Sequence, residues 1–166
     1  KQSVWLVFYK KKSKKPTLTW SEAVDEALCF GWIDSVKKTI DTEKYKQYFS
    51  KRKVKSNWSK INKDKVEILI EQGLMKEEGY KSIEIAKENG SWIILDGVEE
   101  LEIPEDLKEE FANYKGSMEY FDSLSKSAKK ILLYWGISAK RKETREKRII
   151  EIAENASKNQ KPKQFR

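Results

Sequence analysis

Asp34 is the side chain whose type and position most suggest chemistry. It follows Trp32-Ile33 in a stretch with the composition of a β-strand, where aspartate is disfavoured, so we expect its carboxylate to have a partner. The candidates are Arg52, Arg145 and Arg148. Two interpretations follow: a structural ion pair, or a carboxylate that binds a ligand together with arginines.

Polar and aromatic side chains near these positions could complete a ligand pocket. The candidate ligand-binding residues are Asp34, Ser35, Arg52, Ser56, Trp58, Ser59, Asn62 and Arg145. No motif marks a second catalytic carboxylate, so general acid–base catalysis is not supported. An enzyme acting on a small anionic substrate through Asp34 and arginines stays an alternative to a non-catalytic binding protein.

The net charge of +8 conceals a basic–acidic–basic order. Residues 1–60 carry a net charge of +9, residues 61–125 of −10, and residues 126–166 of +9. The acidic middle could neutralise the basic ends, or the ends could form a surface for a small anionic ligand, an acidic protein or nucleic acid. The candidate anion or nucleic-acid contacts are Lys53, Lys55, Lys60, Lys140, Arg141 and Arg148.

Residue spacing favours residues 126–166 as the anion-binding segment. Arg141, Arg145 and Arg148 recur there at i, i+4 and i+7, which places them on one helical face. No helix-turn-helix, zinc-finger or RNA-binding signature accompanies them. Glycine-rich phosphate loops are also missing. Nucleic-acid binding through the two basic segments is therefore a hypothesis based on charge and on the tryptophans, with Trp32 and Trp58 as either core aromatics or base-stacking platforms.

Histidine and cysteine usage excludes several kinds of site. The chain has no histidine and one cysteine, which excludes a histidine-based triad, an internal disulfide and any multi-cysteine metal site. We expect no metal and no cofactor, and a packing role for Cys29 among apolar neighbours. The lack of cysteine pairs predicts the cytoplasm, and no apolar run is long enough for a membrane span. Because the chain begins with Lys1, we expect an upstream segment.

The first third of the chain predicts strands and one helix. Residues 4–9 are β-branched and aromatic, as in a buried strand. Thr19 and Glu22 form a capping-box pattern before a helix that ends near Gly31. Residues 32–40 and 44–53 predict a hairpin whose same-parity apolar residues face a core. A parallel first pair would make a β-α-β crossover in a small mixed sheet.

After residue 56 the hydrophobic spacing becomes helical. We expect helices over 62–72, 76–89, 104–111, 117–124, 125–136 and 142–156, with residues 92–95 as a short strand or extended stretch. The predicted class is α+β: a small mixed sheet with a packed helix at the N-terminal side, followed by a helical C-terminal part. We place a strand-helix-hairpin subdomain at 1–56 and a helical part at 57–166, and we expect the two to form one compact domain.

Three ordered segments resemble a known family. They are EALCFGWIDS at 26–35, KSNWSKIN at 55–62 and AKRKETR at 139–145 followed by Arg148-Ile149. In this order they resemble the YdeI/OmpD-associated family, also called bacteriocin-protection proteins, over nearly the whole chain. Lysine replaces the proline that many members have within 51–53 and 140–142. The resemblance implies a bacterial protein linked to envelope stress or antimicrobial-peptide tolerance, but it implies no established reaction.

Overall fold

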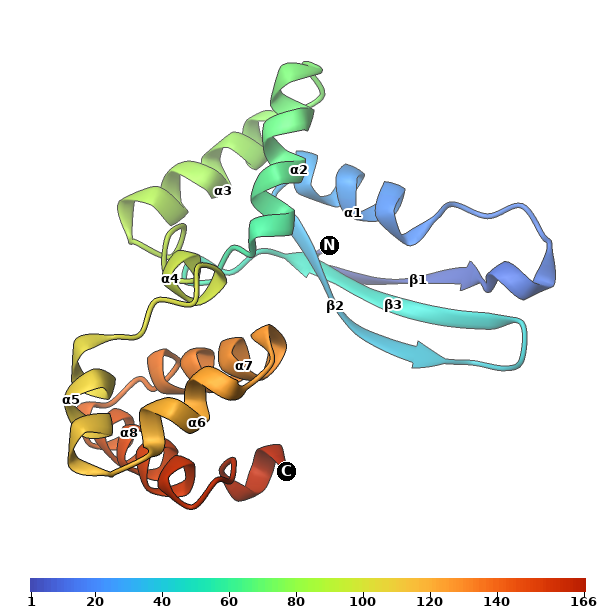
Figure 1. The fold of residues 1–166 in the computed structure, drawn as a ribbon. Helices are drawn as coiled ribbons and strands as arrows, with labels where there is room; N and C mark the ends of the chain where they lie inside the picture. Colours follow the sequence, from blue (N-terminus) through green and yellow to red (C-terminus); the bar gives the residue numbers. More distant parts are fainter. The chain divides into compact units, whose positions relative to one another are not determined.

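The chain folds into two compact units. A computed structural model describes all residues, 1–166, and divides them into Lys1–Ile94 and Leu95–Arg166 (Figure 1). Each unit has its own hydrophobic core. The predicted α+β class is confirmed, because the chain combines a three-stranded sheet with eight α-helices. None of these helices has the length and apolar character needed to cross a membrane.

The sheet of the first unit has the order β1-β3-β2. Its strands are β1 (Ser3–Tyr9), β2 (Trp32–Thr39) and β3 (Lys44–Lys51), and β3 pairs antiparallel with both neighbours. The predicted hairpin is present, but the sheet is not mixed, since β3 lies between β1 and β2. A register shift between Asp34 and Lys37 also breaks the predicted parity. Val36 and Ile40 are therefore exposed, whereas Phe49 is buried.

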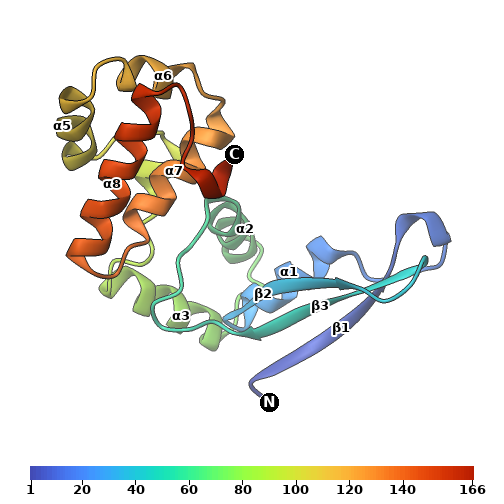
Figure 2. The same cartoon turned by 90° about the horizontal axis from the view of Figure 1, so that it is seen from below.

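Helix α1 (Trp20–Cys29) covers one face of this sheet. The capping box at Thr19 and Glu22 is present in both directions, as the sequence predicts. Val24 and Leu28 of α1 are buried with Phe8 of β1 in one core. The helices of the unit lie on one side of the strands in Figure 1, and Figure 2 presents the strands in front of α1.

Two further helices belong to this unit, so it extends past residue 56. They are α2 (Lys60–Glu71) and α3 (Glu77–Glu88), and a short 3-10 helix spans Lys11–Ser13. Val66 of α2 and Ile83 of α3 join the core that contains Phe8 and Leu28. Residues 92–95 form neither a strand nor an extended stretch: they lie in a turn between α3 and α4.

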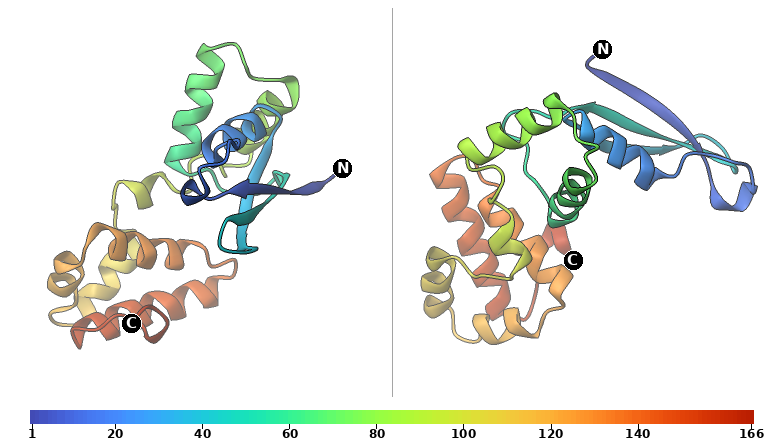
Figure 3. Two further views of the ribbon diagram at one scale, coloured as in Figure 1. Left: turned by 90° about the vertical axis from the view of Figure 1, so that its right-hand side faces the viewer. Right: turned by 90° about the horizontal axis from the view of Figure 1, so that it is seen from above.

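The second unit is helical. It contains α4 (Asp96–Glu99), α5 (Glu105–Asn113), α6 (Ser117–Ser123), α7 (Lys126–Ile137), α8 (Lys142–Ser157) and a 3-10 helix at Lys163–Phe165 (Figure 3). Phe111 and Phe121 pack with 5.3 Å between ring centroids. Leu133 of α7 and Ile152 of α8 complete the centre of this core.

Candidate functional site

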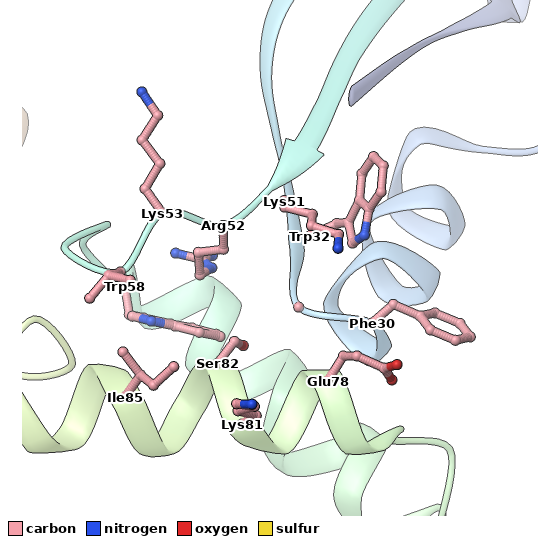
Figure 4. Close-up of a pocket in the computed structure, with 12 residues that line it drawn as sticks. Phe30, Trp32, Lys51, Arg52, Lys53, Trp58, Glu78, Lys81, Ser82 and Ile85 are labelled. Atoms are coloured by element: carbon pink, nitrogen blue, oxygen red, sulfur yellow. The ribbon is translucent and has the colours of Figure 1, made fainter. Parts of the chain in front are cut away.

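A cavity of about 290 Å³ lies in the first unit, where β3 ends and β2 begins. Its wall comes from the start of β2, the segment after β3, and α3 (Figure 4). The charged side chains on this wall are Lys51, Arg52, Lys53, Glu78 and Lys81. Four cationic groups and one carboxylate give the cavity a positive potential, which suits an anionic ligand.

Arg52 occupies the centre of this wall. Its guanidinium lies over the face of Trp58, with Cζ 3.7 Å from the ring centroid (Figure 4). Nη1 donates to the backbone oxygen of Asn57 at 2.9 Å and to Ser56 Oγ at 3.3 Å. Nε and Nη2 are buried and donate to no protein atom. Buried polar groups are almost always hydrogen-bonded, so these two unused donors identify Arg52 as unusual.

Trp58 forms the floor beneath the guanidinium. Its side chain is fully buried, and its ring lies 4.9 Å from that of Trp92. Nε1 of Trp58 is a further buried donor without a partner. The Trp58 ring therefore belongs to the core, and it also fixes the position of Arg52 by cation–π stacking.

Burial dominates the electrostatics of Arg52. It lowers the pKa of the guanidinium to about 10, and the charge of Asp34 acts in the opposite direction. At neutral pH Arg52 is still protonated. Its positive charge is poorly solvated, so an anion placed at Nε and Nη2 would replace both the missing hydrogen bonds and the missing counter-charge.

Asp34 does not form the predicted ion pair with an arginine. Its Oδ2 accepts hydrogen bonds from Trp20 Nε1 and Gln47 Nε2, each at 2.9 Å. Sequence reasoning missed both donors, because Trp20 begins α1 and Gln47 lies on the neighbouring strand. The available signal for Gln47 was an uncharged polar residue between the aromatic residues Tyr45 and Tyr48 of β3, and it is buried. Asp34 is not part of the cavity wall.

The remaining predicted ligand residues are placed apart. Ser35 is exposed. Ser59 caps α2 by accepting from the amide of Asn62, so both residues have a structural role. Arg145 lies in the second unit and binds Asp106 through Nε and Nη2, at 2.6 and 2.9 Å. Of the predicted pocket, the structure brings together Arg52, Ser56 and Trp58.

The predicted anion or nucleic-acid contacts are also divided between the units. Lys53 lines the cavity, while Lys55 and Lys60 are exposed nearby in sequence. Lys140 and Arg141 are exposed in the second unit. Arg148 donates to the backbone oxygen of Trp135 at 2.7 Å and to Ser138 Oγ at 3.1 Å. The arginine face of α8 is thus partly used within its own unit.

Helix α3 supplies wall residues that sequence reasoning missed. Glu78, Lys81 and Ser82 belong to no recognisable sequence motif. They reach the cavity because α3 packs closely against the end of α1 at Gly79. A Cβ at Gly79 would lie 2.4 Å from the backbone oxygen of Cys29. A glycine early in a helix was the available signal, because its low helix propensity needs a packing reason.

Comparison with known families divides the chain in a similar way. Fold and site define a two-unit α+β protein with a cationic cavity in its first unit. Residues 100–159 match the family described as bacteriocin-protection, YdeI or OmpD-associated. Residues 1–82 match a domain of unknown function, DUF8412. Neither the curated proteins nor the solved structures provide a significant match.

The family match confirms the resemblance but covers less of the chain than the motifs suggested. The third motif, 139–149, lies within residues 100–159. The motifs at 26–35 and 55–62 lie in the segment matched by the domain of unknown function. The cavity is built almost entirely from that same N-terminal segment, so the family name does not describe it.

Proposed function

We propose that this chain is a non-catalytic binding protein whose first unit holds a small anion, and that it serves bacterial tolerance to antimicrobial peptides. The observation that carries the proposal is the Arg52 side chain, with two buried donor atoms unused at the wall of a positively charged cavity. The family of residues 100–159 supplies the link to bacteriocin protection.

The geometry of the free donors favours an anion with at least two oxygens. Nε–H and one N–H of Nη2 project side by side from a guanidinium, and they match two oxygens of a phosphate or carboxylate. Stacking on Trp58 keeps the guanidinium plane fixed, so little side-chain entropy remains to be lost on binding. Both atoms are covered from solvent, so binding includes a shift of the side chains that cover them.

The other groups at the site support binding more than catalysis. Glu78 is the one carboxylate on the wall, whereas hydrolytic acid–base chemistry uses a pair of tuned groups. The Ser82 hydroxyl donates to the backbone oxygen of Gly79 at 2.9 Å. Cys29 is buried, and burial raises the pKa of its thiol, which opposes formation of a nucleophilic thiolate.

Thermal unfolding in the presence of phosphate, pyrophosphate or citrate tests the binding proposal. A ligand at a hundred times its Kd stabilises the folded state by about 2.7 kcal/mol, which raises Tm by several degrees. Arg52→Met should remove this shift. Lys51→Gln combined with Lys81→Gln should reduce it without touching the core, since both lysines are exposed.

The control carries the same change of net charge in the second unit. Lys115→Gln combined with Lys126→Gln neutralises two exposed lysines outside the cavity and should leave the shift intact. Equal stabilisation of wild type, Arg52→Met and the control would contradict an anion site at Arg52.

The role in tolerance has a separate test in cells. Deleting the gene should increase sensitivity to a cationic antimicrobial peptide, and the wild-type gene should restore tolerance while Arg52→Met should not. Unaltered sensitivity of the deletion strain would contradict the tolerance role but not the anion site.

A further inference from the structure

The face of the sheet opposite α1 is aromatic and basic. Strand pairing places Trp5 beside Tyr48, Val7 beside Lys46, and Tyr9 beside Lys44, while Lys38 of β2 lies beside Lys46. Side chains alternate along a strand, so these residues point away from the face that buries Phe8 and Phe49. We name the surface formed by these seven residues the open face; its members are Trp5, Val7, Tyr9, Lys38, Lys44, Lys46 and Tyr48.

Trp5 is the exposed ring of the open face, Tyr9 and Tyr48 are half-buried, and lysines lie beside these rings. Trp5 is 39% exposed and Val7 is 57% exposed. Lys46 Nζ lies 4.8 Å and Lys38 Nζ 5.7 Å from the Trp5 ring centroid, and Lys44 Nζ lies 5.5 Å from that of Tyr9. None of the seven residues of the open face is acidic. At its Tyr9 end, Lys15 Nζ lies 5.1 Å from the ring centroid and pairs with Glu43 at 2.9 Å, so the charge of Lys38 and Lys46 around Trp5 is the part without an acidic partner inside the surface.

We propose that the open face binds single-stranded nucleic acid. Bases would stack on Trp5 with Tyr48 at one end and on Tyr9 at the other, about 13 Å away along β1. The lysines lie between and beside these rings, where they would contact the phosphates. Stacking accepts any base and charge accepts any phosphate, so the binding would have little sequence preference.

Charge and shape favour this occupant over others. A second copy of the chain would bring six lysines together across a two-fold axis, which costs energy. Duplex nucleic acid keeps its bases stacked inside and would leave the three rings of the open face unused. The Asp and Glu side chains of an acidic peptide would satisfy the lysines but carry no aromatic ring to stack on exposed Trp5.

The open face is independent of the anion cavity. The cavity is lined by Trp32 and Lys51, which project from the opposite face of the sheet, and by α3. Loss of one activity therefore leaves the other to be measured, and Arg52→Met should bind nucleic acid as the wild type does.

Fluorescence anisotropy of the full chain with labelled oligothymidylate and oligouridylate tests the proposal. Binding should be strong at low salt and should quench tryptophan fluorescence. Trp5→Ala should weaken binding about tenfold, since it removes one stacking platform. Lys38→Gln combined with Lys46→Gln should reduce the slope of log K against log salt by about 1.4, because two phosphate contacts are lost.

The control variant is again Lys115→Gln with Lys126→Gln, which changes net charge equally at exposed positions of the second unit. It should retain the wild-type affinity and slope, and circular dichroism should show that every variant is folded. Absence of binding at low salt, equal losses in the control, duplex binding as tight as single-strand binding, or a dimer that Trp5→Ala dissociates would each overturn the proposal.

Discussion

Arg52 illustrates how a single residue can be stabilised in position yet left chemically incomplete. Stacking on Trp58 and the hydrogen bond to the Asn57 carbonyl hold its guanidinium. Nε and Nη2 nevertheless stay unpaired, although a buried guanidinium costs free energy unless its donors are used. In an arginine with a purely structural role, we would expect these donors to form hydrogen bonds with protein acceptors. The anion that we propose would accept hydrogen bonds from both of these donors.

Asp34 differs from Arg52 because its carboxylate already accepts hydrogen bonds from protein donors. Replacing it in Asp34→Asn keeps one acceptor oxygen but presents an NH₂ group to the donors of Trp20 and Gln47. We predict a loss of about 1–3 kcal/mol in the free energy of unfolding, with anion affinity retained. Urea denaturation and a phosphate titration check this; unchanged stability with lost binding would place Asp34 in the site.

At the scale of elements, the approach of α3 to α1 depends on one glycine. The amide of Lys76 donates to the Cys29 carbonyl at 3.0 Å, and a Cβ at Gly79 would meet that same carbonyl oxygen. This contact brings Glu78, Lys81 and Ser82 to the cavity. The low helix propensity of glycine is thus offset by close packing.

We predict that Gly79→Ala destabilises the protein although alanine favours helices. The propensity gain of about 1 kcal/mol is smaller than the cost of moving two packed backbones, about 1–3 kcal/mol or more. Gly136→Ala in α7 is the matched control, since a Cβ there would contact nothing within 4 Å; it should stabilise by about 0.5–1 kcal/mol. Denaturant unfolding that ranks the two variants in the reverse order would contradict this packing account.

The ion pair between α5 and α8 should make stability depend on pH. The hydrogen bonds from Arg145 hold the pKa of Asp106 below its ordinary value of 3.8. A carboxyl with a lowered folded-state pKa stabilises the protein above 3.8 and loses that contribution as the pH falls through the folded-state pKa.

Arg145→Gln should therefore be less stable than wild type at pH 7 by about 0.5–1 kcal/mol, a modest value because the pair is partly exposed. The difference should close as the pH falls below 3.8. Unfolding curves over an acid series measure it, and a difference that persists or grows in acid would show that Arg145 acts through packing instead.

Local sequence signals predicted the individual helices and strands well, but they predicted the contacts between those elements poorly. The capping box of Thr19 with Glu22 and the hairpin turn at Asp41, whose carboxylate accepts the amides of Glu43 and Lys44, involve neighbours in the chain. The same holds for the site: Arg52, Ser56 and Trp58 are close in sequence. The insertion of β3 between β1 and β2 and the use of α3 depend on distant packing, which no short pattern encodes.

At the scale of the whole molecule, the two cores share no residue. Trp58, Val66 and Ile83 belong to the first core, and Phe111 and Ile152 to the second. Charge follows this organisation only in part, because the acidic middle of the sequence continues across both units. The change to helical hydrophobic spacing after residue 56 is therefore a change of secondary structure within the first unit, not a boundary between the units.

We predict that residues 1–94 fold alone and keep the anion site. The fragment contains a complete core and every cavity residue, and its length suffices for an independent domain. Circular dichroism, cooperative thermal unfolding and phosphate-induced stabilisation should match the behaviour of this unit in the full chain. An unfolded fragment would show that the second unit is needed for the first to fold.

The central claim is that Arg52 donates to a bound anion, and the most direct test observes its Nε–H group by NMR. The chain has five arginines, so the side-chain spectrum is simple, and Arg52→Lys assigns the signal. Adding phosphate should shift the Arg52 signal and slow its exchange with water, while the Arg145 signal, already bound to Asp106, should stay in place. An Arg52 signal that does not move, or equal shifts at all arginines, would contradict the account.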